Sequence, residues 1–498
     1  MYNLIKLNRK DNVAVAPMNI PINKEIDTNI VSQDNIPFGH KIALSKIEKN
    51  SYVYKYGQVI GIASKNILPG EHVHSHNLIF SEFKREAIIK NNKKDISKDL
   101  DPLFFQGFKR KNGKYGTRNY IGLLSTVNCS ATVVKKIADK INNNSKLQQY
   151  ENIDGAVCLK HSSGCGMNNK GYGMTVFNQT IEGFKHHPNF SKVFVIGLGC
   201  ECAQISLYQE KDDSVVYMNI QDEGGTKKII ESVSNQILEI LPDLNKEHRE
   251  KVPIAELTLA LQCGCSDAYS GITANPALGY AADLLVKNGG SAILAETPEI
   301  YGAEHLLIER ANNKEIVTKL TKQIDWWKNY MAINDGSLDN NPSPGNKKGG
   351  LTTILEKSLG AVAKSGTSSM EDVLSYAEPL KKKGFNYMDS PGYDPVSVTG
   401  QVASGSNIIC FTTGRGSCFG FKPVPSVKIA TNTNMFNNLE DDMDINAGSI
   451  MDGESDIKKI GEIIFNQIID TASGKLTKSE INGYGDDEFN PWIIGATL

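Results

Sequence analysis

The 498-residue sequence lacks long hydrophobic runs and has no surplus of charge of either sign. No apolar stretch approaches the roughly 18 residues that suggest a membrane-spanning helix, and the N-terminus lacks the apolar core of a signal peptide. The formal net charge of −2 leaves no basic surplus to displace counterions from a nucleic acid. We therefore expect a cytoplasmic protein that partners neither a membrane nor a nucleic acid.

Two motifs of common enzyme classes are also missing. No Gly-x-Gly-x-x-Gly follows an expected strand with an acidic residue about 20 positions later, which argues against a dinucleotide site. No Gly-x-Ser-x-Gly stands on a strand-helix turn, which argues against an acyl-transfer hydrolase. The nine cysteines do not suggest a disulfide framework in a chain of this length. Cys165, Cys200 and Cys263 stand beside glycines, where thiols suit ligation or catalysis better than packing.

The most informative stretch runs from Leu257 to Leu307. Its apolar head, 257–261, is long enough for a buried strand and leads into the polar sequence 262–267. A helical pattern over 277–287 ends at Asn-Gly-Gly, and a second apolar strand over 292–295 ends in Glu-Thr-Pro-Glu. This pattern predicts a β-α-β unit with thiol, hydroxyl and carboxylate groups at the carboxyl ends of both strands, where open α/β sheets bind ligands.

The same order of strand, polar Gly/Cys turn and helix recurs earlier, around 120–130, 155–166 and 193–202. Such a succession is typical of parallel sheets. The fold we predict is α/β and multidomain: a small N-terminal β-rich module followed by two α/β domains with mainly parallel sheets. We place the module at 1–78, a charged linker at 79–103, the second domain at 104–250 and the C-terminal domain at 251–498.

The N-terminal module carries a concentration of histidines. His72, His74 and His76 alternate, so a strand would point all three to one face, and His40 lies in the same module. Imidazoles gathered on one face suit a divalent metal such as iron, zinc or manganese. The alternative is a solvated polar strand.

Further polar groups follow in the C-terminal part of the chain. The loop 339–350 is rich in proline and glycine and supplies Asn346 and Lys347, although its composition also suits a flexible surface loop. The apolar run 408–411 leads into Thr413 and Arg415, and an arginine offers a carboxylate a bidentate fork. An arginine solvated at a tight turn is the alternative.

Together these motifs resemble the altronate/galactarate dehydratase family along essentially the whole chain. The resemblance rests on Gly-His-Lys at 39–41, His-Val-His-Ser-His-Asn at 72–77, Gly-Thr-Arg-Asn at 116–119, Gly-Leu-Gly-Cys-Glu at 197–201, Ser-Gly-Ile-Thr-Ala-Asn-Pro at 270–276, Asn-Pro-Ser-Pro-Gly-Asn-Lys at 341–347 and Thr-Gly-Arg-Gly at 413–416. It implies that the N-terminal module is a β-clip of the SAF type. It also implies an iron-dependent hydro-lyase that acts on sugar acids.

Dehydration of such an acid removes the proton beside the carboxylate and expels the neighbouring hydroxyl, giving a 2-keto-3-deoxy acid and water. D-altronate is the substrate we expect, because the histidine-rich segment is closest to the altronate branch. Around His161 the neighbouring residues depart from both branches, so galactarate stays as the alternative substrate. A non-catalytic sugar-acid-binding protein of the same fold is a further alternative.

The expected site residues fall into three groups. For catalysis we expect His161, Lys347 and Cys165. For substrate binding we expect Arg118, Asn119, Asn346, Thr413 and Arg415. For the metal we expect His40, His72, His74, Cys129, Cys200 and Cys263.

Two cofactors are open at this point. A mononuclear Fe(II) or Mn(II) ranks ahead of an iron-sulfur cluster, because the thiols lack the tight spacing of a ferredoxin motif. The small-molecule partner is the sugar acid, and the one protein partner we allow for is a second copy of the chain, in a homodimer.

Overall fold

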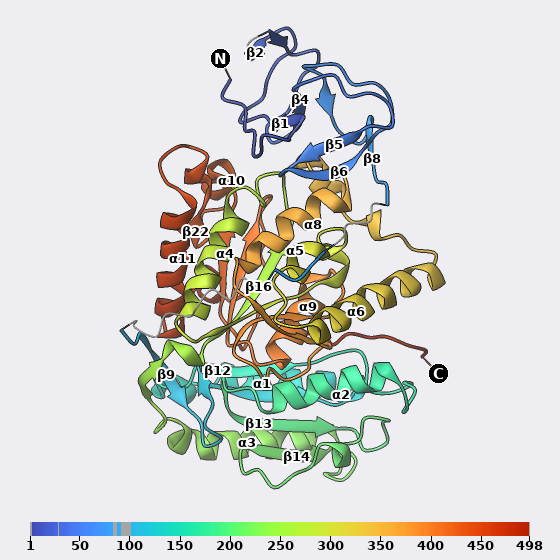
Figure 1. The fold of residues 1–498 in the computed structure, drawn as a ribbon. Helices are drawn as coiled ribbons and strands as arrows, with labels where there is room; N and C mark the ends of the chain where they lie inside the picture. Colours follow the sequence, from blue (N-terminus) through green and yellow to red (C-terminus); the bar gives the residue numbers. More distant parts are fainter. Residues whose placement is uncertain (1, 28, 83–86, 91–100, 498) are drawn as a thin grey trace.

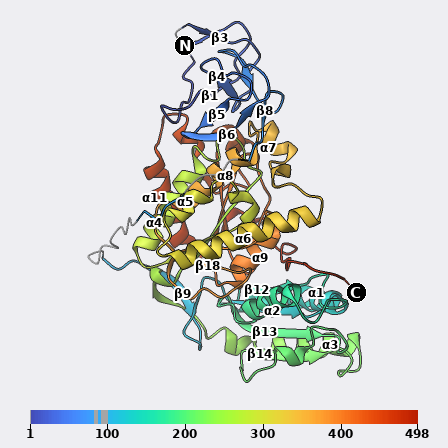
Figure 2. The same cartoon turned by 45° about the vertical axis from the view of Figure 1, so that its right-hand side comes forward.

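The computed structural model describes residues 2–27, 29–82, 87–90 and 101–497. It stacks three parts along one axis: the N-terminal module at one end, the C-terminal α/β domain in the middle and the second domain at the other end (Figure 1). The view turned by 45° shows the same order, so the two ends of the molecule are separated by the C-terminal domain (Figure 2). Within the described residues no helix is both long and apolar enough to cross a membrane.

The N-terminal module consists of short antiparallel strands in three small sheets, β1-β4-β7, β5-β6-β8 and β2-β3. Their bounds are β1 Val13–Val15, β2 Glu25–Asp27, β3 Ile30–Val31, β4 Lys41–Ala43, β5 Tyr52–Lys55, β6 Gln58–Ala63, β7 His72–Val73 and β8 Leu78–Ile79. Hydrophobic residues of the module are buried both in its own centre and against the C-terminal domain. The predicted strand-rich module is therefore confirmed. Residues 83–86 and 91–100 of the predicted linker lie outside the described residues.

The second domain is a four-stranded parallel sheet in the order β12-β11-β13-β14, flanked by α1, α2 and α3. Its elements are β11 Tyr120–Ser125, α1 Asn128–Asn142, β12 Gly155–Leu159, α2 Tyr172–Lys185, β13 Phe190–Gly197, β14 Val215–Asn219 and α3 Thr226–Leu244. A small antiparallel sheet joins its two ends, through β9 Phe104–Lys109, β10 Tyr115–Gly116 and β15 Arg249–Pro253.

The C-terminal domain is built on a seven-stranded sheet in the order β18-β19-β17-β16-β20-β21-β22, in which every pairing is parallel. The strands are β16 Thr258–Gly264, β17 Ser291–Leu294, β18 Met370–Leu374, β19 Gly384–Met388, β20 Ile408–Thr413, β21 Ser426–Ala430 and β22 Ile445–Asn446. The helices are α4 Ala274–Lys287, α5 Glu304–Ile308, α6 Lys314–Ile333, α7 Pro344–Lys348, α8 Ile354–Val362, α9 Asp394–Ala403, α10 Thr433–Asn438, α11 Ile457–Ala472 and α12 Lys478–Ile481.

The central strand β16 shows why both faces of this sheet are covered. Successive side chains of a strand point to opposite faces. Leu259 and Leu261 pack with α4 and α11, whereas Ala260 packs with α9. A strand buried on both sides reads as a continuous apolar run, which is the pattern that predicted it. The parallel α/β character of both larger domains is confirmed.

Two local predictions were wrong. The histidines do not alternate along one strand, because β7 ends at Val73 and a turn begins at His74, whose carbonyl accepts the amides of Asn77 and Leu78. The loop 339–350 is not irregular throughout, because α7 starts inside it with Pro344 at its first turn. A capping box between Ser343 and Asn346 closes that start. A proline is tolerated at the first helical position, since its missing N–H has no partner there anyway.

Candidate active site at the carboxyl edge of the C-terminal sheet

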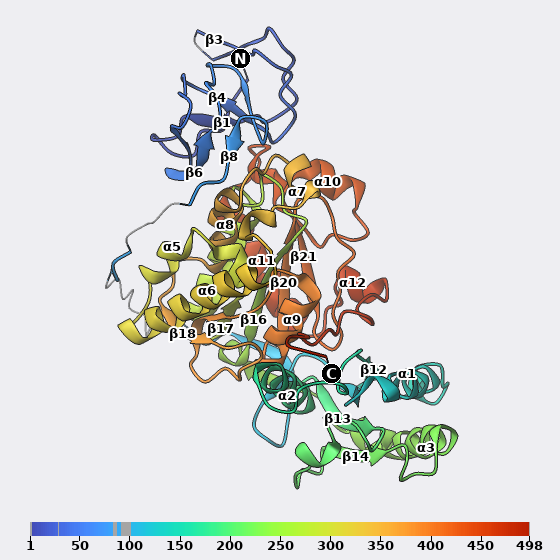
Figure 3. The ribbon, with the colours of Figure 1, turned by 90° about the vertical axis from the view of Figure 1, so that its right-hand side faces the viewer.

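The N-terminal module docks on the C-terminal domain directly above α7 and α8 (Figure 3). A buried ionic group fixes this contact: Glu356 of α8 accepts bonds from Lys41 at 2.8 Å and from Lys55 at 2.9 Å. Lys41 also donates to the Gly350 carbonyl at 2.7 Å. The two lysines hold the pKa of the Glu356 carboxyl far below its ordinary value, although burial alone would raise it. The module therefore sits on the domain in a fixed register.

Four histidines of the module meet above α7, and we call them the histidine face: His40, His72, His74 and His76. Ring centroids of neighbouring members are 4.9 to 5.4 Å apart. The Nδ1 atom of His40 lies 2.9 Å from Nε2 of His72. The Nε2 atoms of His40 and His74 contact the carbonyls of Lys348 and Lys347 at 3.1 and 2.9 Å. A strand, a turn and a remote loop thus bring together residues that are up to 36 positions apart.

The histidine face fits a divalent metal chemically. Burial is the largest cause that lowers the pKa of His40, of His72 (to about 3) and of His74 (to about 4), so the rings are neutral at physiological pH, as ligands must be. Two ligands at right angles on one metal, with bonds of about 2.1 Å, lie about 3 Å apart. The 2.9 Å contact between His40 and His72 has this separation, whereas no third ligand atom among the described residues lies within 4.8 Å of both nitrogens.

A second cluster lies in the C-terminal domain, where β17 and β19 end, and we call it the acid-lysine cluster: Glu296, Glu299, Lys357, Lys364 and Asp394. Lys357 of α8 donates to Glu299 at 2.7 Å, and Lys364 approaches Glu296 at 3.9 Å. The second carboxylate oxygen of Glu299 is buried and has no hydrogen-bond partner. Native structures rarely leave a buried acceptor unpaired, so this oxygen is a candidate to accept from a ligand.

The three carboxyl groups of the acid-lysine cluster differ in their protonation. Burial is the main cause that raises the pKa of Glu296 well above its ordinary value, with Glu299 adding to the effect. Burial likewise raises the pKa of Asp394, to about 6. Lys357 instead lowers the pKa of Glu299 against the opposing effect of burial. Environments that separate the pKa values of neighbouring acids are typical of sites that exchange protons.

The loop after β16 contacts the neighbouring loops at this edge, those after β20 and β21. Asp267 is buried and accepts from Thr431, Ser270 and Asn432, so the loops after β16 and β21 are joined through one carboxylate. A Cβ atom at Gly414 would lie 2.3 Å from the Asp267 carboxyl carbon, so only glycine permits this approach. The Arg415 amide donates to the Cys265 carbonyl at 3.2 Å.

Several residues predicted from the sequence meet at this edge. Asn346 is buried and donates to the Ser266 carbonyl at 2.8 Å, which joins α7 to the β16 loop. The Lys347 carbonyl contacts His74, as described above, and its side chain is half-buried. Thr413 ends β20, and its hydroxyl accepts from the Gly416 amide. Arg415 follows with an exposed side chain. These four, with His40, His72 and His74, form one neighbourhood.

Cys263 also lies at this edge but is buried, with Sγ 2.8 Å from the Ser266 hydroxyl. The remaining predicted residues lie elsewhere. Arg118, Asn119, His161, Cys129, Cys165 and Cys200 belong to the second domain, on the far side of the C-terminal domain from the histidine face (Figure 1). The predicted metal ligands therefore do not form a single set.

Arg118 is fully engaged within the protein. It is 1% exposed and forms a bidentate pair with Glu480, at 2.6 and 2.8 Å. Its other N–H groups donate to the carbonyls of Thr117, Thr471 and Lys475. All five donors of the guanidinium have protein acceptors. A role in substrate binding would require this network to open.

Asn119 and His161 have protein partners as well. The Asn119 side chain binds Arg110 and the Asn152 carbonyl. His161 is buried against Phe177 and Phe489, and burial lowers its pKa to about 4. One ring nitrogen of His161 contacts the Ser125 carbonyl, and the other accepts from the Ser163 amide. Both ring nitrogens of His161 are thus engaged by the protein, so neither is free for the predicted catalytic role.

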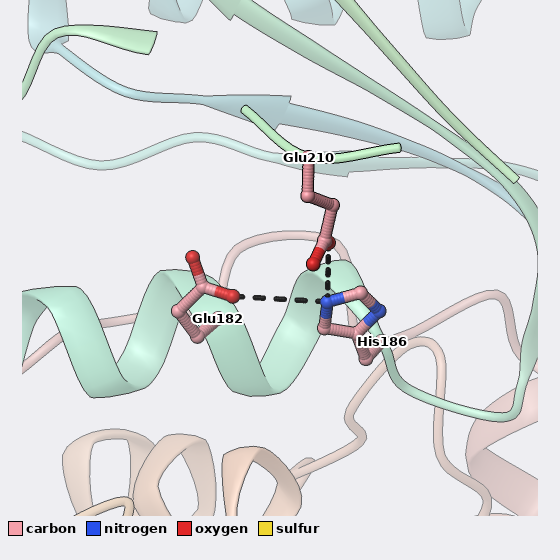
Figure 4. A group of neighbouring side chains, drawn as sticks. All are labelled: Glu182, His186 and Glu210. Atoms are coloured by element: carbon pink, nitrogen blue, oxygen red, sulfur yellow. Dashed lines mark ion pairs between the residues drawn. The ribbon is translucent and has the colours of Figure 1, made fainter. Parts of the chain in front are cut away.

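One further group has ligand atoms already close together. Among the described residues, Glu182, His186 and Glu210 alone place three such atoms within 4.8 Å of one another (Figure 4). Lys185 already donates to both glutamates, at 2.8 and 2.9 Å. A cation would have to displace this ammonium, so we assign the group a structural role in the second domain.

Sequence reasoning missed the acid-lysine cluster. The signal for Glu296 and Glu299 was present, because both follow the second apolar run of the β-α-β unit. Lys357 and Lys364 lie in a helical pattern, and Asp394 begins α9 in a stretch that carries no motif. Only the fold brings these three beside the glutamates.

Comparisons with known proteins indicate the same family for all three parts of the chain. Three sequence families match in order: the altronate/galactarate dehydratase SAF domain at 2–81, the second domain of D-galactarate dehydratase/altronate hydrolase at 107–245 and the C-terminal D-galactarate/altronate dehydratase domain at 254–497. Altronate dehydratase of Bacillus subtilis (strain 168) is 35% identical over the full length of both chains.

Two proteins of Escherichia coli (strain K12) are similar as well. Galactarate dehydratase (L-threo-forming) is 39% identical and covers 95% of this chain and 93% of its own. Altronate dehydratase is 34% identical and covers 96% of this chain and 97% of its own. With the site and these matches in place, the chain belongs to the altronate/galactarate dehydratase family of hydro-lyases.

Proposed function

We propose that this hydro-lyase dehydrates D-altronate to a 2-keto-3-deoxy acid in a metal-dependent reaction. The observation that carries the proposal is the position of the two clusters: the neutral histidine face contacts α7, and the acid-lysine cluster includes Lys357 of the following helix α8. The end-to-end match with the altronate dehydratase of B. subtilis supports the choice of substrate.

The roles follow from the protonation of each group. Arg415, exposed at the end of β20, would hold the carboxylate of the acid through its guanidinium fork. Asp394, with a pKa of about 6, is ionised at neutral pH and would take the proton beside the carboxylate. Glu296, whose pKa burial raises well above its ordinary value, would give its proton to the departing hydroxyl. The unpartnered oxygen of Glu299 would accept from a further hydroxyl of the substrate.

His40, His72 and His74 would hold a bound Fe(II) or Mn(II), which would supply a Lewis acid for the developing negative charge. Replacing each histidine by alanine and measuring iron per chain and dehydration rate tests this part. We expect both quantities to fall in each variant. His248→Ala, a change in the second domain, serves as the control. Full iron and full rate in all three variants would remove the histidine face from the metal site.

Galactarate is the second candidate substrate, because the galactarate dehydratase of E. coli has the higher identity, 39%. The test is a panel of aldonic and aldaric acids incubated with the purified protein, with the keto acid product followed by NMR. D-altronate should give the highest kcat/KM. Preferred turnover of galactarate would reassign the substrate. Binding of these acids without turnover would favour a sugar-acid-binding protein instead.

A further inference from the structure

We infer that the second domain holds an iron-sulfur cluster on Cys129, Cys165 and Cys200. The inference goes beyond the proposed function and does not rest on it. The three thiols follow three adjacent strands of one parallel sheet: Cys165 follows β12, Cys129 follows the central strand β11, and Cys200 follows β13. Parallel strands present all their carboxyl ends at one edge. We call this edge, with its exposed cysteines, the thiol rim: Cys129, Cys165, Cys200 and Cys202.

Backbone contacts hold together the three segments that carry the thiols: the first turn of α1, which contains Cys129, and the loops after β12 and β13. The Asn128 amide donates to the Ser163 carbonyl at 2.9 Å, and the Ala203 amide donates to the Gly164 carbonyl at 3.2 Å. Gly164 has a φ of +97°, and a Cβ atom there would lie 2.0 Å from the Thr126 carbonyl oxygen. The loop of Cys165 is therefore wedged between the loops of the other thiols, at a point where only glycine fits.

Glu201 fixes the third loop to the first. Its buried carboxylate accepts from the Thr126 hydroxyl at 2.7 Å and from the amides of Leu198 and Gly199 at 3.1 and 2.6 Å. Cys200 directly precedes Glu201 in the sequence, and its sulfur accepts a hydrogen bond from the Gln221 side chain at 3.8 Å. The thiols thus project from a rigid backbone.

The thiols of the rim are free and exposed, unlike those that pack in the interior. Cys158 and Cys410 lie within strands, and burial raises the pKa of both thiols, that of Cys158 to about 11. Such cysteines behave as small apolar residues. Solvent-facing thiols on a fixed loop contribute nothing to packing, so their gathering on one edge needs another explanation.

The thiols are not grouped tightly enough for zinc. A tetrahedral zinc with bonds of about 2.3 Å holds its thiolates only about 3.8 Å apart. In the described part of the chain no three cysteines bring their sulfurs within 4.8 Å of one another. An iron-sulfur cluster places several irons and inorganic sulfides between its thiolates and spans a wider ring. Each thiol gives up its proton on ligation. A four-iron cluster of charge 2+ contains two ferric and two ferrous irons with four sulfides, so iron supplied in both states assembles it without a further oxidant.

Three thiolates would leave one iron of a four-iron cluster open to water or to a hydroxy acid. This iron centre would be separate from the histidine face, since the C-terminal domain lies between them (Figure 2). The full chain would then carry two kinds of iron. Inorganic sulfide would accompany the iron of the cluster but not the iron of the histidine face.

The experiment is to purify the full-length protein without oxygen and incubate it with equal amounts of ferrous and ferric iron and with sulfide. Iron, acid-labile sulfide and visible absorption are then measured per chain. We expect about four sulfides and a broad charge-transfer band. Cys129→Ser, Cys165→Ser and Cys200→Ser should each lose the sulfide and the band, whereas Cys418→Ser, which removes an exposed thiol of the C-terminal domain, should keep both. A wild-type protein that takes up no sulfide, or three variants that keep it, would overturn the inference.

A measurement on the wild-type chain avoids any folding defect of the variants. Iodoacetamide is applied to the loaded protein and to the same protein after chelation, and the modified cysteines are mapped by mass spectrometry. Cys129, Cys165 and Cys200 should be protected only when loaded, whereas Cys418 should react in both states. Equal reaction of the three thiols in both states would contradict the cluster, whatever the dehydration rate.

Discussion

Arg118 is the residue for which the sequence and the structure predict different roles. The motif that contains it predicts substrate binding, whereas the structure shows it in a contact between two domains. Its guanidinium joins the second domain to the C-terminal domain, through Glu480 and the carbonyls of Thr471 and Lys475. Removing one partner of a buried ion pair typically costs about 3–5 kcal/mol, because the other charge is left uncompensated. We expect Arg118→Met to lower the free energy of unfolding by about this amount.

Arg118→Lys gives an intermediate case. Lysine keeps the charge but has three donors for the five contacts that arginine makes, so at least two hydrogen bonds are lost. At about 1 kcal/mol for each bond, the variant should be about 2 kcal/mol less stable than wild type. The assay is urea unfolding followed by tryptophan fluorescence, with KM measured on the folded variant. A double-mutant cycle with Glu480→Gln isolates the pair.

The two interpretations predict opposite results for Arg118→Lys. If the arginine fastens two domains, stability falls and KM stays near the wild-type value. A KM raised about tenfold or more, with stability changed by less than about 1 kcal/mol, would refute the structural interpretation. It would return Arg118 to the substrate site.

Three further predictions concern the site and the response to pH. Arg415→Lys keeps the charge but loses the fork, so kcat/KM should fall; an unchanged value would remove Arg415 from the site. Asp394→Asn should lower kcat by about 10²–10⁴ and abolish the loss of kcat/KM below pH about 6, which the wild type should show as this base becomes protonated. Burial lowers the pKa of His187 to about 3, below the unfolded value near 6.5, so the native state binds fewer protons and stability falls with decreasing pH, by about 2 kcal/mol at pH 5. His187→Gln should flatten that slope in urea titrations between pH 6.5 and 5; an unaltered slope would assign it to other groups.

Much of the fold follows from local pattern. The buried strand around 257–261 and the helix after it were predictable because their apolar runs and glycine stop are continuous in sequence. The structure extends this strand to Gly264 and starts the helix at Ala274, three residues earlier than the pattern indicated. The parallel pairing follows from the repeated order of strand and helix.

The site was predictable only in part, because its residues converge through the fold. Arg415 and Asn346 stand in recognisable motifs, and the structure brings both to the edge where the histidines meet. Lys357 lies on the inward face of α8, where the sequence pattern reads as an ordinary helix. Its partner Glu299 is 58 positions away. No spacing rule connects such residues, since the contact depends on how α8 crosses the sheet.

The ionic group of Lys41, Lys55 and Glu356 has a consequence for how substrate reaches the site. Each of these side chains is at most 2% exposed, and Lys41 uses its ammonium on Glu356 and on a backbone carbonyl. Lifting the N-terminal module by even a few ångströms would separate buried charges before water could reach them, at a cost of several kcal/mol. The module is therefore held in a fixed position over the sheet edge. We expect substrate to reach the sheet edge without any lifting of the module.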